Sequence, residues 1–203
     1  MTLSIAGRCP ETGMLGGAVT SSSICVASRC LFTRAGVGAA LTQNVTDTSL
    51  GEKMLNLLES EGDVKTALSR VVSEANNIQW RQLVLLDSMG RSALHTGKEV
   101  LGLHATVQGD QCAAAANLLA NKSVPSAMVE TFESSSGHLA GRLIAALEAG
   151  VNAGGEEGPV FSAGVEVAHK VSWPIVDLRV DWDDEPISKL QTIWNEYQPQ
   201  VEA

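Results

Sequence analysis

The order in which strand-like and helix-like segments follow one another most constrains the fold of this chain. Apolar periodicity predicts strands over residues 2–8, 14–21 and 36–42, then two amphipathic helices from residue 47 onward, separated by Gly62 and Asp63. Further strands are predicted over 82–87, 92–96 and 105–115, and a second helical pair begins at 125 and 139. Strands over 161–167 and 175–181 and a helix over 186–197 complete the chain.

This grouping of strands and helix pairs favours a layered α+β fold over a doubly wound sheet. In a doubly wound sheet, strands and helices alternate one for one, which they do not do here. If both sheets are to bury a face, the economical packing is sheet on sheet with helices on the outsides. We therefore expect a four-layer αββα sandwich. Because no linker-like segment divides the chain, residues 1–203 are expected to form one domain.

Thr2 is the candidate nucleophile, because removal of Met1 would make it the first residue. It would then carry a hydroxyl and a free α-amine, and such an amine titrates at about pH 7.7–8.0. At neutral pH, the unprotonated fraction of this amine can take the proton from the hydroxyl. Methionine aminopeptidase favours a small second residue, so we expect Met1 to be removed. The other interpretation is that Thr2 simply begins an ordinary first strand.

Composition excludes several classes of partner. The formal net charge is -9, and neither Lys nor Arg forms a run that could neutralise phosphates. These features argue against nucleic acid and anionic membranes as partners. The apolar run at the N-terminus is too short for a signal peptide, and no stretch approaches the length of a membrane span. We therefore expect a cytoplasmic protein.

The cysteines and histidines do not predict a metal site. The chain has four of each, all dispersed, and no C-x-x-C pair occurs. Reduced, buried thiols are the expected state of cysteines in a cytosolic protein of this size. Cys25 as a catalytic nucleophile is the other interpretation, but no histidine lies near it in the sequence. We expect no metal and no cofactor.

Several segments together resemble a known bacterial family. Their order and spacing make the match specific, and they extend over nearly the whole chain: residues 2–13, 33–43, 81–83 with Asp87 and Gly90-Arg91, 96–97, 117–119, 146–150 and 176–181. The family is domain of unknown function 1028, which is placed in the N-terminal nucleophile (Ntn) hydrolase superfamily. The resemblance implies the αββα sandwich that the order of elements independently predicts.

The resemblance also implies a reaction. Members of the superfamily cleave amide bonds, so the implied function is hydrolysis of a C–N amide bond of a small molecule through an ester on the Thr2 hydroxyl. By analogy with the superfamily, whose sandwiches pack through their outer layers, we expect a homo-oligomer. The alternative is a non-catalytic small-molecule binding or assembly protein that keeps the same fold.

This chemistry needs a group that keeps the α-amine neutral and a group that passes protons. Arg34 is the candidate cation, because it closely precedes the glycine-rich strand and a permanent positive charge disfavours protonation of a neighbouring amine. Ser21 ends the strand that pairs with the Thr2 strand in a hairpin, so its hydroxyl is a candidate proton relay. The alternatives are a surface arginine in a turn and a polar turn over residues 20–23.

Side-chain amides are the candidates for binding the substrate. Gln43 and Asn44 directly follow the strand predicted over 36–42, and they can donate amide hydrogens to an oxyanion or a substrate carbonyl. Asn117 is a third candidate, although asparagine near the end of a strand is more often a turn former.

Two departures from the family pattern motivate the non-catalytic alternative. Where the family has a basic, polar stretch after paired glycines, this chain has Glu156 and Glu157 within residues 154–163. The residue after Ser21, which is often basic in relatives, is Ser22. We therefore expect a less cationic pocket than that of the relatives, which would bind a different substrate or none.

Overall fold

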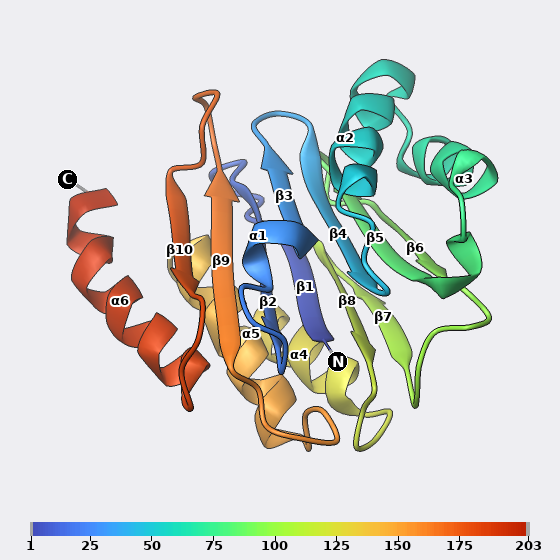
Figure 1. The fold of residues 1–203 in the computed structure, drawn as a ribbon. Helices are drawn as coiled ribbons and strands as arrows, with labels where there is room; N and C mark the ends of the chain where they lie inside the picture. Colours follow the sequence, from blue (N-terminus) through green and yellow to red (C-terminus); the bar gives the residue numbers. More distant parts are fainter. Residues whose placement is uncertain (1, 202–203) are drawn as a thin grey trace.

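The computed structural model describes residues 2–201, which form two antiparallel sheets and six α-helices (Figure 1). The larger sheet has six strands in the order β10-β9-β2-β1-β8-β7. Their bounds are Val176–Val180, Ser162–Ala168, Leu15–Ser21, Thr2–Arg8, Cys112–Asn117 and Ala105–Gly109. The smaller sheet has the order β3-β4-β5-β6, with bounds Leu31–Arg34, Gly38–Asn44, Arg81–Asp87 and Ser92–Thr96.

Helices α2 to α6 lie where the periodicity predicts helices, whereas α1 was not predicted. Their bounds are Ala27–Cys30 for α1, Ser49–Glu61 for α2, Val64–Glu74 for α3, Val124–Ser134 for α4, Leu139–Asn152 for α5 and Pro186–Val201 for α6; a 3-10 turn covers Ile78–Trp80. Asp63 is the N-cap of α3, and its carboxylate accepts a hydrogen bond of 2.8 Å from the Thr66 N–H. Among residues 2–201, no helix combines the length and the apolar character needed to cross a membrane.

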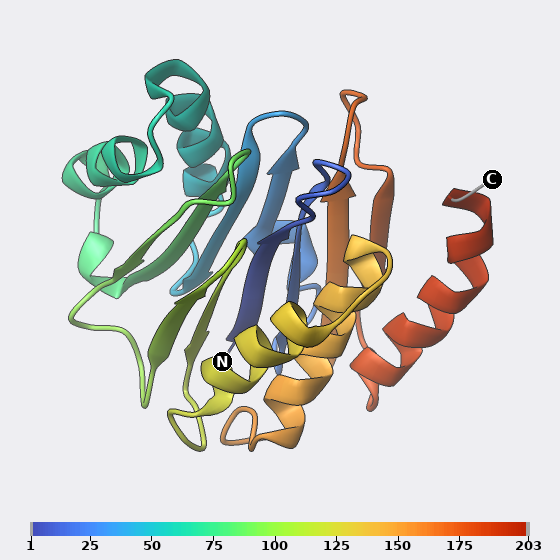
Figure 2. The same cartoon turned by 180° about the vertical axis from the view of Figure 1, so that it is seen from behind.

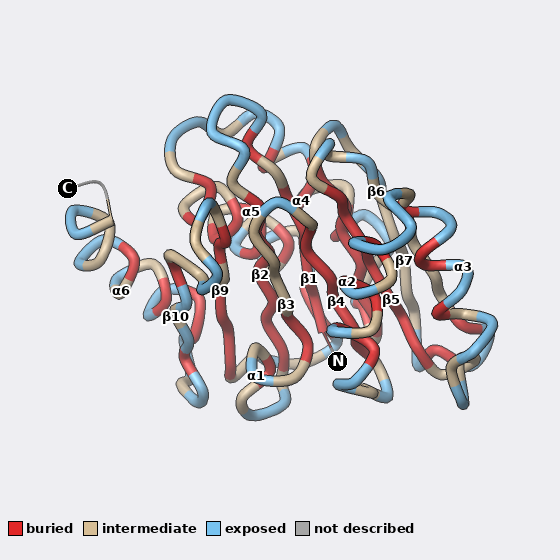
Figure 3. Tube along the Cα trace, turned by 90° about the horizontal axis from the view of Figure 1, so that it is seen from above, coloured by how far each residue is buried: buried red, intermediate tan, exposed pale blue. Residues whose placement is uncertain are grey.

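Hydrophobic packing divides the core into three clusters. The first cluster lies between the larger sheet and helices α4, α5 and α6. The second lies between the two sheets, and the third lies between the smaller sheet and helices α2 and α3. Figure 3 shows that the buried positions follow the strands, while exposure concentrates in the connecting loops.

Two features of the secondary structure differ from the prediction. The segment 105–115, which we expected to be one strand, forms β7 and β8, because Gln111 takes a left-handed φ of 60° and reverses the chain. Helix α1 and strand β3 have no counterpart in the predicted elements. Each has four residues, which is too short for a period to show, and β3 exists by pairing with β4.

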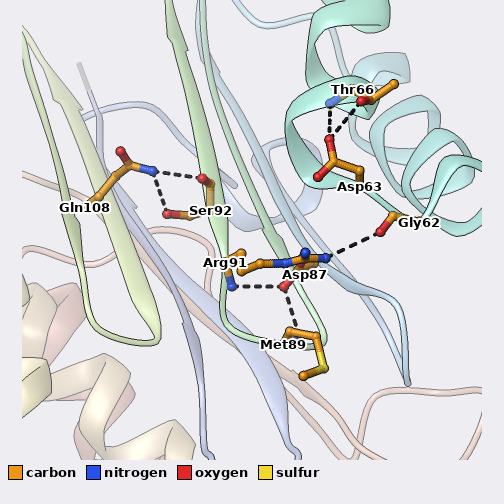
Figure 4. A network of polar contacts seen from close by, with 8 residues as sticks. All are labelled: Gly62, Asp63, Thr66, Asp87, Met89, Arg91, Ser92 and Gln108. Atoms are coloured by element: carbon orange, nitrogen blue, oxygen red, sulfur yellow. Dashed lines mark hydrogen bonds and ion pairs between the residues drawn. The ribbon is translucent and has the colours of Figure 1, made fainter.

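A polar network closes the turn between β5 and β6 (Figure 4). The buried Asp87 carboxylate accepts hydrogen bonds from the Arg91 N–H at 2.9 Å and from Arg91 Nε at 2.6 Å. Arg91 Nη2 also donates to the Gly62 carbonyl, at 3.4 Å. Nearby, Gln108 Nε2 donates to the Ser92 carbonyl at 2.8 Å, which links an edge strand of one sheet to an edge strand of the other. These bonds tie the α2–α3 connection and both sheets together.

Strand β1 can lie close to α4 because Gly7 has no side chain. A Cβ atom at Gly7 would come within 2.5 Å of Phe132 Cζ. The Phe132 ring is fully buried, and the Arg142 guanidinium lies 4.2 Å from its centroid on one side. This ring therefore fills the space between the central strand and the helical layer.

We expect Phe132→Ala to lower the free energy of unfolding by about 3–5 kcal/mol, because it removes a buried ring and leaves a cavity against β1. Urea denaturation measures this change. Trp173→Ala, at a side chain that is 64% exposed, is the matched control, with an expected change within about 0.5 kcal/mol. Equal stabilities for the two variants would contradict this account of the core.

Candidate functional site

Thr2, the first residue of β1, lies in a row of buried polar side chains on three neighbouring strands. β1 lies between β2 and β8, and the register pairs Thr2 with Asn117 and Leu3 with Thr20. Extending the second pairing by one residue places Ser21 opposite Thr2. Thr2, Ser21 and Asn117 are 5%, 1% and 0% exposed. The structure therefore brings these three candidate residues together.

This row faces the smaller sheet. Side chains alternate between the two faces of a strand. Leu3 and Ile5 belong to the core cluster under α4 and α5, whereas Ala6 belongs to the cluster between the sheets. Thr2 and Ser4 share the face of Ala6, so the β1 end of the space between the sheets is polar.

The smaller sheet supplies a buried network of side-chain amides at the same end. Ser4 Oγ donates a hydrogen bond of 2.6 Å to Gln43 Oε1. Gln43 Nε2 donates to Gln82 Oε1 at 2.7 Å and to the Ala115 carbonyl at 3.2 Å. Asn117 Nδ2 donates to the same Gln82 oxygen at 3.1 Å. Two of the candidate amides, Gln43 and Asn117, thus bind the same oxygen of Gln82, a residue that the sequence does not single out.

Glu156 is a further residue that the sequence reasoning missed. It lies in the connection between α5 and β9, which Figures 1 and 2 show at the same end of the molecule as the N-terminus. Glu156 is only 5% exposed, whereas the neighbouring Glu157 is exposed. The sequence does not distinguish the two acids, because adjacent residues of one type carry no signal of which one is buried.

Glu156 reaches across the start of β1. Its backbone forms a β-bridge with Leu119, just after β8, and its Oε2 accepts a hydrogen bond of 3.3 Å from the Ser22 N–H, just after β2. Since β1 lies between β2 and β8, the loop spans the end of β1 at which Thr2 lies. Burial raises the pKa of the Glu156 carboxyl to about 7, and the hydrogen bond from Ser22 acts in the opposite direction.

Two buried acceptor atoms at this end have no hydrogen-bond partner within the described part of the chain. They are Glu156 Oε1 and Asn117 Oδ1. Buried polar atoms in folded proteins are nearly always paired, so unpaired ones commonly mark a site where a ligand, an ion or a reacting group binds. Both atoms belong to residues next to the start of β1.

The structure does not bring Arg34 to Thr2. Arg34 pairs with Gly38 at the turn end of the β3–β4 hairpin, whereas Gln43 lies near the opposite end of β4, about 17 Å away at 3.4 Å per residue. The Arg34 guanidinium instead forms ion pairs with Glu52 at 2.7 Å and Glu59 at 2.8 Å, both in α2. Arg34 is close in sequence to the glycine-rich strand β4. It lies at the turn between β3 and β4, however, which is the end of β4 far from the site.

Asn44 also has a different role from the one expected. It takes a left-handed φ of 78°, and its Nδ2 donates a hydrogen bond of 2.7 Å to the Trp80 carbonyl. Its Oδ1 accepts from the Leu101 N–H at 3.2 Å. All of its side-chain groups therefore hold neighbouring loops. Arg81, paired with Asn44 in the sheet, is a nearby cation, but it alternates with the inward-facing Gln82 and so faces outward.

No metal centre is visible in residues 2–201, where no three His, Cys, Asp or Glu side chains group around a common point.

The described features define an α/β protein with two facing antiparallel sheets and a buried polar site at the start of a central strand. The profile of the Family of unknown function (DUF1028) matches residues 2–190. The chain belongs to this family, which confirms the family resemblance.

A solved structure agrees with this assignment. A crystal structure of a Silicibacter pomeroyi protein labelled with the same family has a TM-score of 0.91 and 33% sequence identity, covering 97% of this chain and 86% of that chain. Anbu (ancestral beta-subunit) from Yersinia bercovieri has a TM-score of 0.39 and 11% identity, covering 98% of this chain and 96% of that one. No curated protein matches the chain.

The amide network generates a prediction about stability. Gln82→Leu removes the oxygen that accepts from both Gln43 and Asn117, and we expect the free energy of unfolding to fall by about 1–3 kcal/mol. Chemical denaturation measures the change. Gln200→Leu, at an exposed position in α6, is the matched control and should change stability by less than about 0.5 kcal/mol. A Gln82→Leu protein as stable as this control would show that the network contributes nothing.

Proposed function

We propose that this chain is an amidohydrolase of the N-terminal nucleophile type, built as a four-layer αββα sandwich, with Thr2 as its nucleophile after removal of Met1. The substrate is a small molecule with a C–N amide bond. The observation that supports this most is the place of Thr2, at the start of a central strand in a buried polar row between two sheets. The expectation about Met1 lies outside the described residues.

In the proposed reaction, Thr2 Oγ1 attacks the carbonyl carbon of the substrate amide while its proton passes to the α-amine. The C–N bond then breaks, and the departing amine takes that proton, so an acyl ester remains on Thr2. Water attacks the ester, the α-amine again accepts a proton, and return of this proton to Thr2 Oγ1 releases the carboxylic acid. The residue is regenerated, and no external reductant or oxidant is needed.

The other candidate residues have supporting roles in the proposal. We assign the Ser21 hydroxyl to proton relay, since the register places it opposite Thr2. Gln43 and Asn117 already donate their amide hydrogens inside the network, so we assign them to positioning the site rather than to an oxyanion hole. Arg34 and Asn44 have no part, because their side chains bind elsewhere.

We expect Thr2→Ala to lower hydrolysis by about 10⁴-fold or more and Thr2→Ser to retain it, because serine keeps both hydroxyl and amine. The measurement is a screen of amide metabolites, with mass-spectrometric detection of an acylated N-terminal peptide. Thr20→Ala is the matched control: this threonine is also buried, on the opposite face of β2, and its loss should leave turnover intact. Unchanged turnover in Thr2→Ala, with Met1 retained in the intact mass, contradicts the proposal.

The second candidate function is non-catalytic binding of a small molecule on the same fold. It is favoured by a cavity of about 630 Å³ at the opposite end of β1, lined by residues that include Cys9, Glu11 and Arg142. A ligand bound there should raise the melting temperature without forming a product, and its affinity should be equal in Thr2→Ala. Thermal shift with product analysis measures both, and turnover of the stabilising ligand eliminates this candidate.

A further inference from the structure

A buried carboxylate spans the start of the central strand. The Glu156 backbone is bridged to Leu119 after β8, and the adjacent Glu157 N–H donates to the Leu118 carbonyl at 2.9 Å. On the other side, Glu156 Oε2 accepts from the Ser22 N–H after β2. Contacts to both neighbours of β1 fix the side chain beside the end at which Thr2 begins the strand.

The environment of Glu156 leaves one carboxylate oxygen in need of a donor. Oε1 is buried and has no hydrogen-bond partner among residues 2–201. A buried carboxylate is costly unless it is paired or protonated. Burial raises the pKa of Glu156, and the positive charge of the chain's N-terminus and then the hydrogen bond from Ser22 lower it. A cationic hydrogen-bond donor at the start of β1 would remove the cost of burial.

We infer that Glu156 is a positioning residue that binds the α-amino group of Thr2 once Met1 has been removed. Hydrolysis of the Met1–Thr2 peptide bond turns an amide nitrogen with one N–H into an ammonium group with three N–H donors. Asn117 Oδ1, the second unpaired buried acceptor, belongs to the residue paired with Thr2 on β8. The ammonium group of Thr2 would therefore bring new N–H donors to the start of β1, where Glu156 Oε1 and Asn117 Oδ1 are acceptors without a partner.

Charged and titratable groups on the surrounding elements do not compete for this role. Cys30 of α1, which packs over β2 and β4, is buried, and burial raises the pKa of its thiol, so it stays neutral. Arg81 faces the outer side of the smaller sheet, and Glu157 is exposed. Of these groups, Glu156 is the one whose charge lies buried at the start of β1.

This pairing rests on the proposed function and adds a control on its pH dependence. A carboxylate beside an ammonium favours the charged form and raises the pKa of the amine. Glu156 thus fixes the direction of the amine and sets the pH above which that amine becomes a base. The ascending limb of the pH–rate profile reports the coupled pair rather than either group alone.

The experiment measures the pKa of the Thr2 amine directly, without any substrate. The protein is prepared with Thr2 as its first residue, verified by intact mass, and the ¹³C shifts of labelled threonine are followed against pH, with Thr2 assigned from Thr2→Ser. We expect Glu156→Gln to lower the amine pKa by about 1–3 units. Gln has the same shape as Glu and keeps an acceptor for the Ser22 N–H.

Glu166→Gln is the matched control. Burial raises the pKa of Glu166 to about 7 as well, but its Oε1 accepts a hydrogen bond of 2.5 Å from Thr33 Oγ1, away from β1. This variant should leave the amine pKa unchanged. Glu156→Asp, which shortens the side chain, provides a second test if the Gln variant does not fold, with a smaller fall in pKa expected.

An amine pKa that is the same in wild type, Glu156→Gln and Glu156→Asp overturns the inference. A selective fall in the Glu156 variants supports it, and the ascending limb of the pH–rate profile should move down with it. The proposed hydrolysis is assayed separately. If the amine pKa falls only in the Glu156 variants but no substrate is hydrolysed, the proposed reaction is wrong. The pairing of Glu156 with the Thr2 amine is then still supported.

Discussion

The need to pair buried polar groups between the two sheets is the constraint on which the rest of the structure depends. The small side chains of Ala113 and Ala115 in β8 face the smaller sheet and allow the two sheets to lie close together, so polar atoms there are shielded from water. Two hydrogen bonds meet this constraint by crossing from one sheet to the other: Ser4 Oγ donates to Gln43 Oε1 at 2.6 Å, and Asn117 Nδ2 donates to Gln82 Oε1 at 3.1 Å. The bonds have one good geometry, and they therefore fix the position of the smaller sheet beneath the row of Thr2.

Electrostatics at the site differ from those implied by the family resemblance. That resemblance led us to expect a cation beside the Thr2 amine, and Arg34 was the candidate. The structure pairs Arg34 with two acids of α2 and instead places the Glu156 carboxylate at the start of β1. A neighbouring carboxylate favours the ammonium form of an amine, whereas a cation disfavours it. The acidic loop, a departure from the family pattern, therefore lies beside the start of β1.

Local signals predicted much of the fold and part of the candidate site. Asp63 caps α3 as expected, and the turn after Arg8 closes the β1–β2 hairpin, because capping and turn formation depend on a few adjacent residues. Strand β3 and the break at Gln111 were not predicted, since each depends on pairing with a distant segment or on a left-handed residue with no glycine signal. Ser21 was placed correctly beside Thr2 because hairpin register is a local property.

The amino-acid sequence alone determined the order of the elements, the alternation that turns Thr2 and Ser4 to one face, and the family. Periodicity and turn chemistry carry that information within short windows. Tertiary structure alone decided which distant polar groups meet: Gln82 joins Gln43 to Asn117, and Glu156 is buried while Glu157 faces solvent. Such contacts depend on how whole sheets and loops pack, and burial, which costs a carboxylate most, is a property of the packed chain.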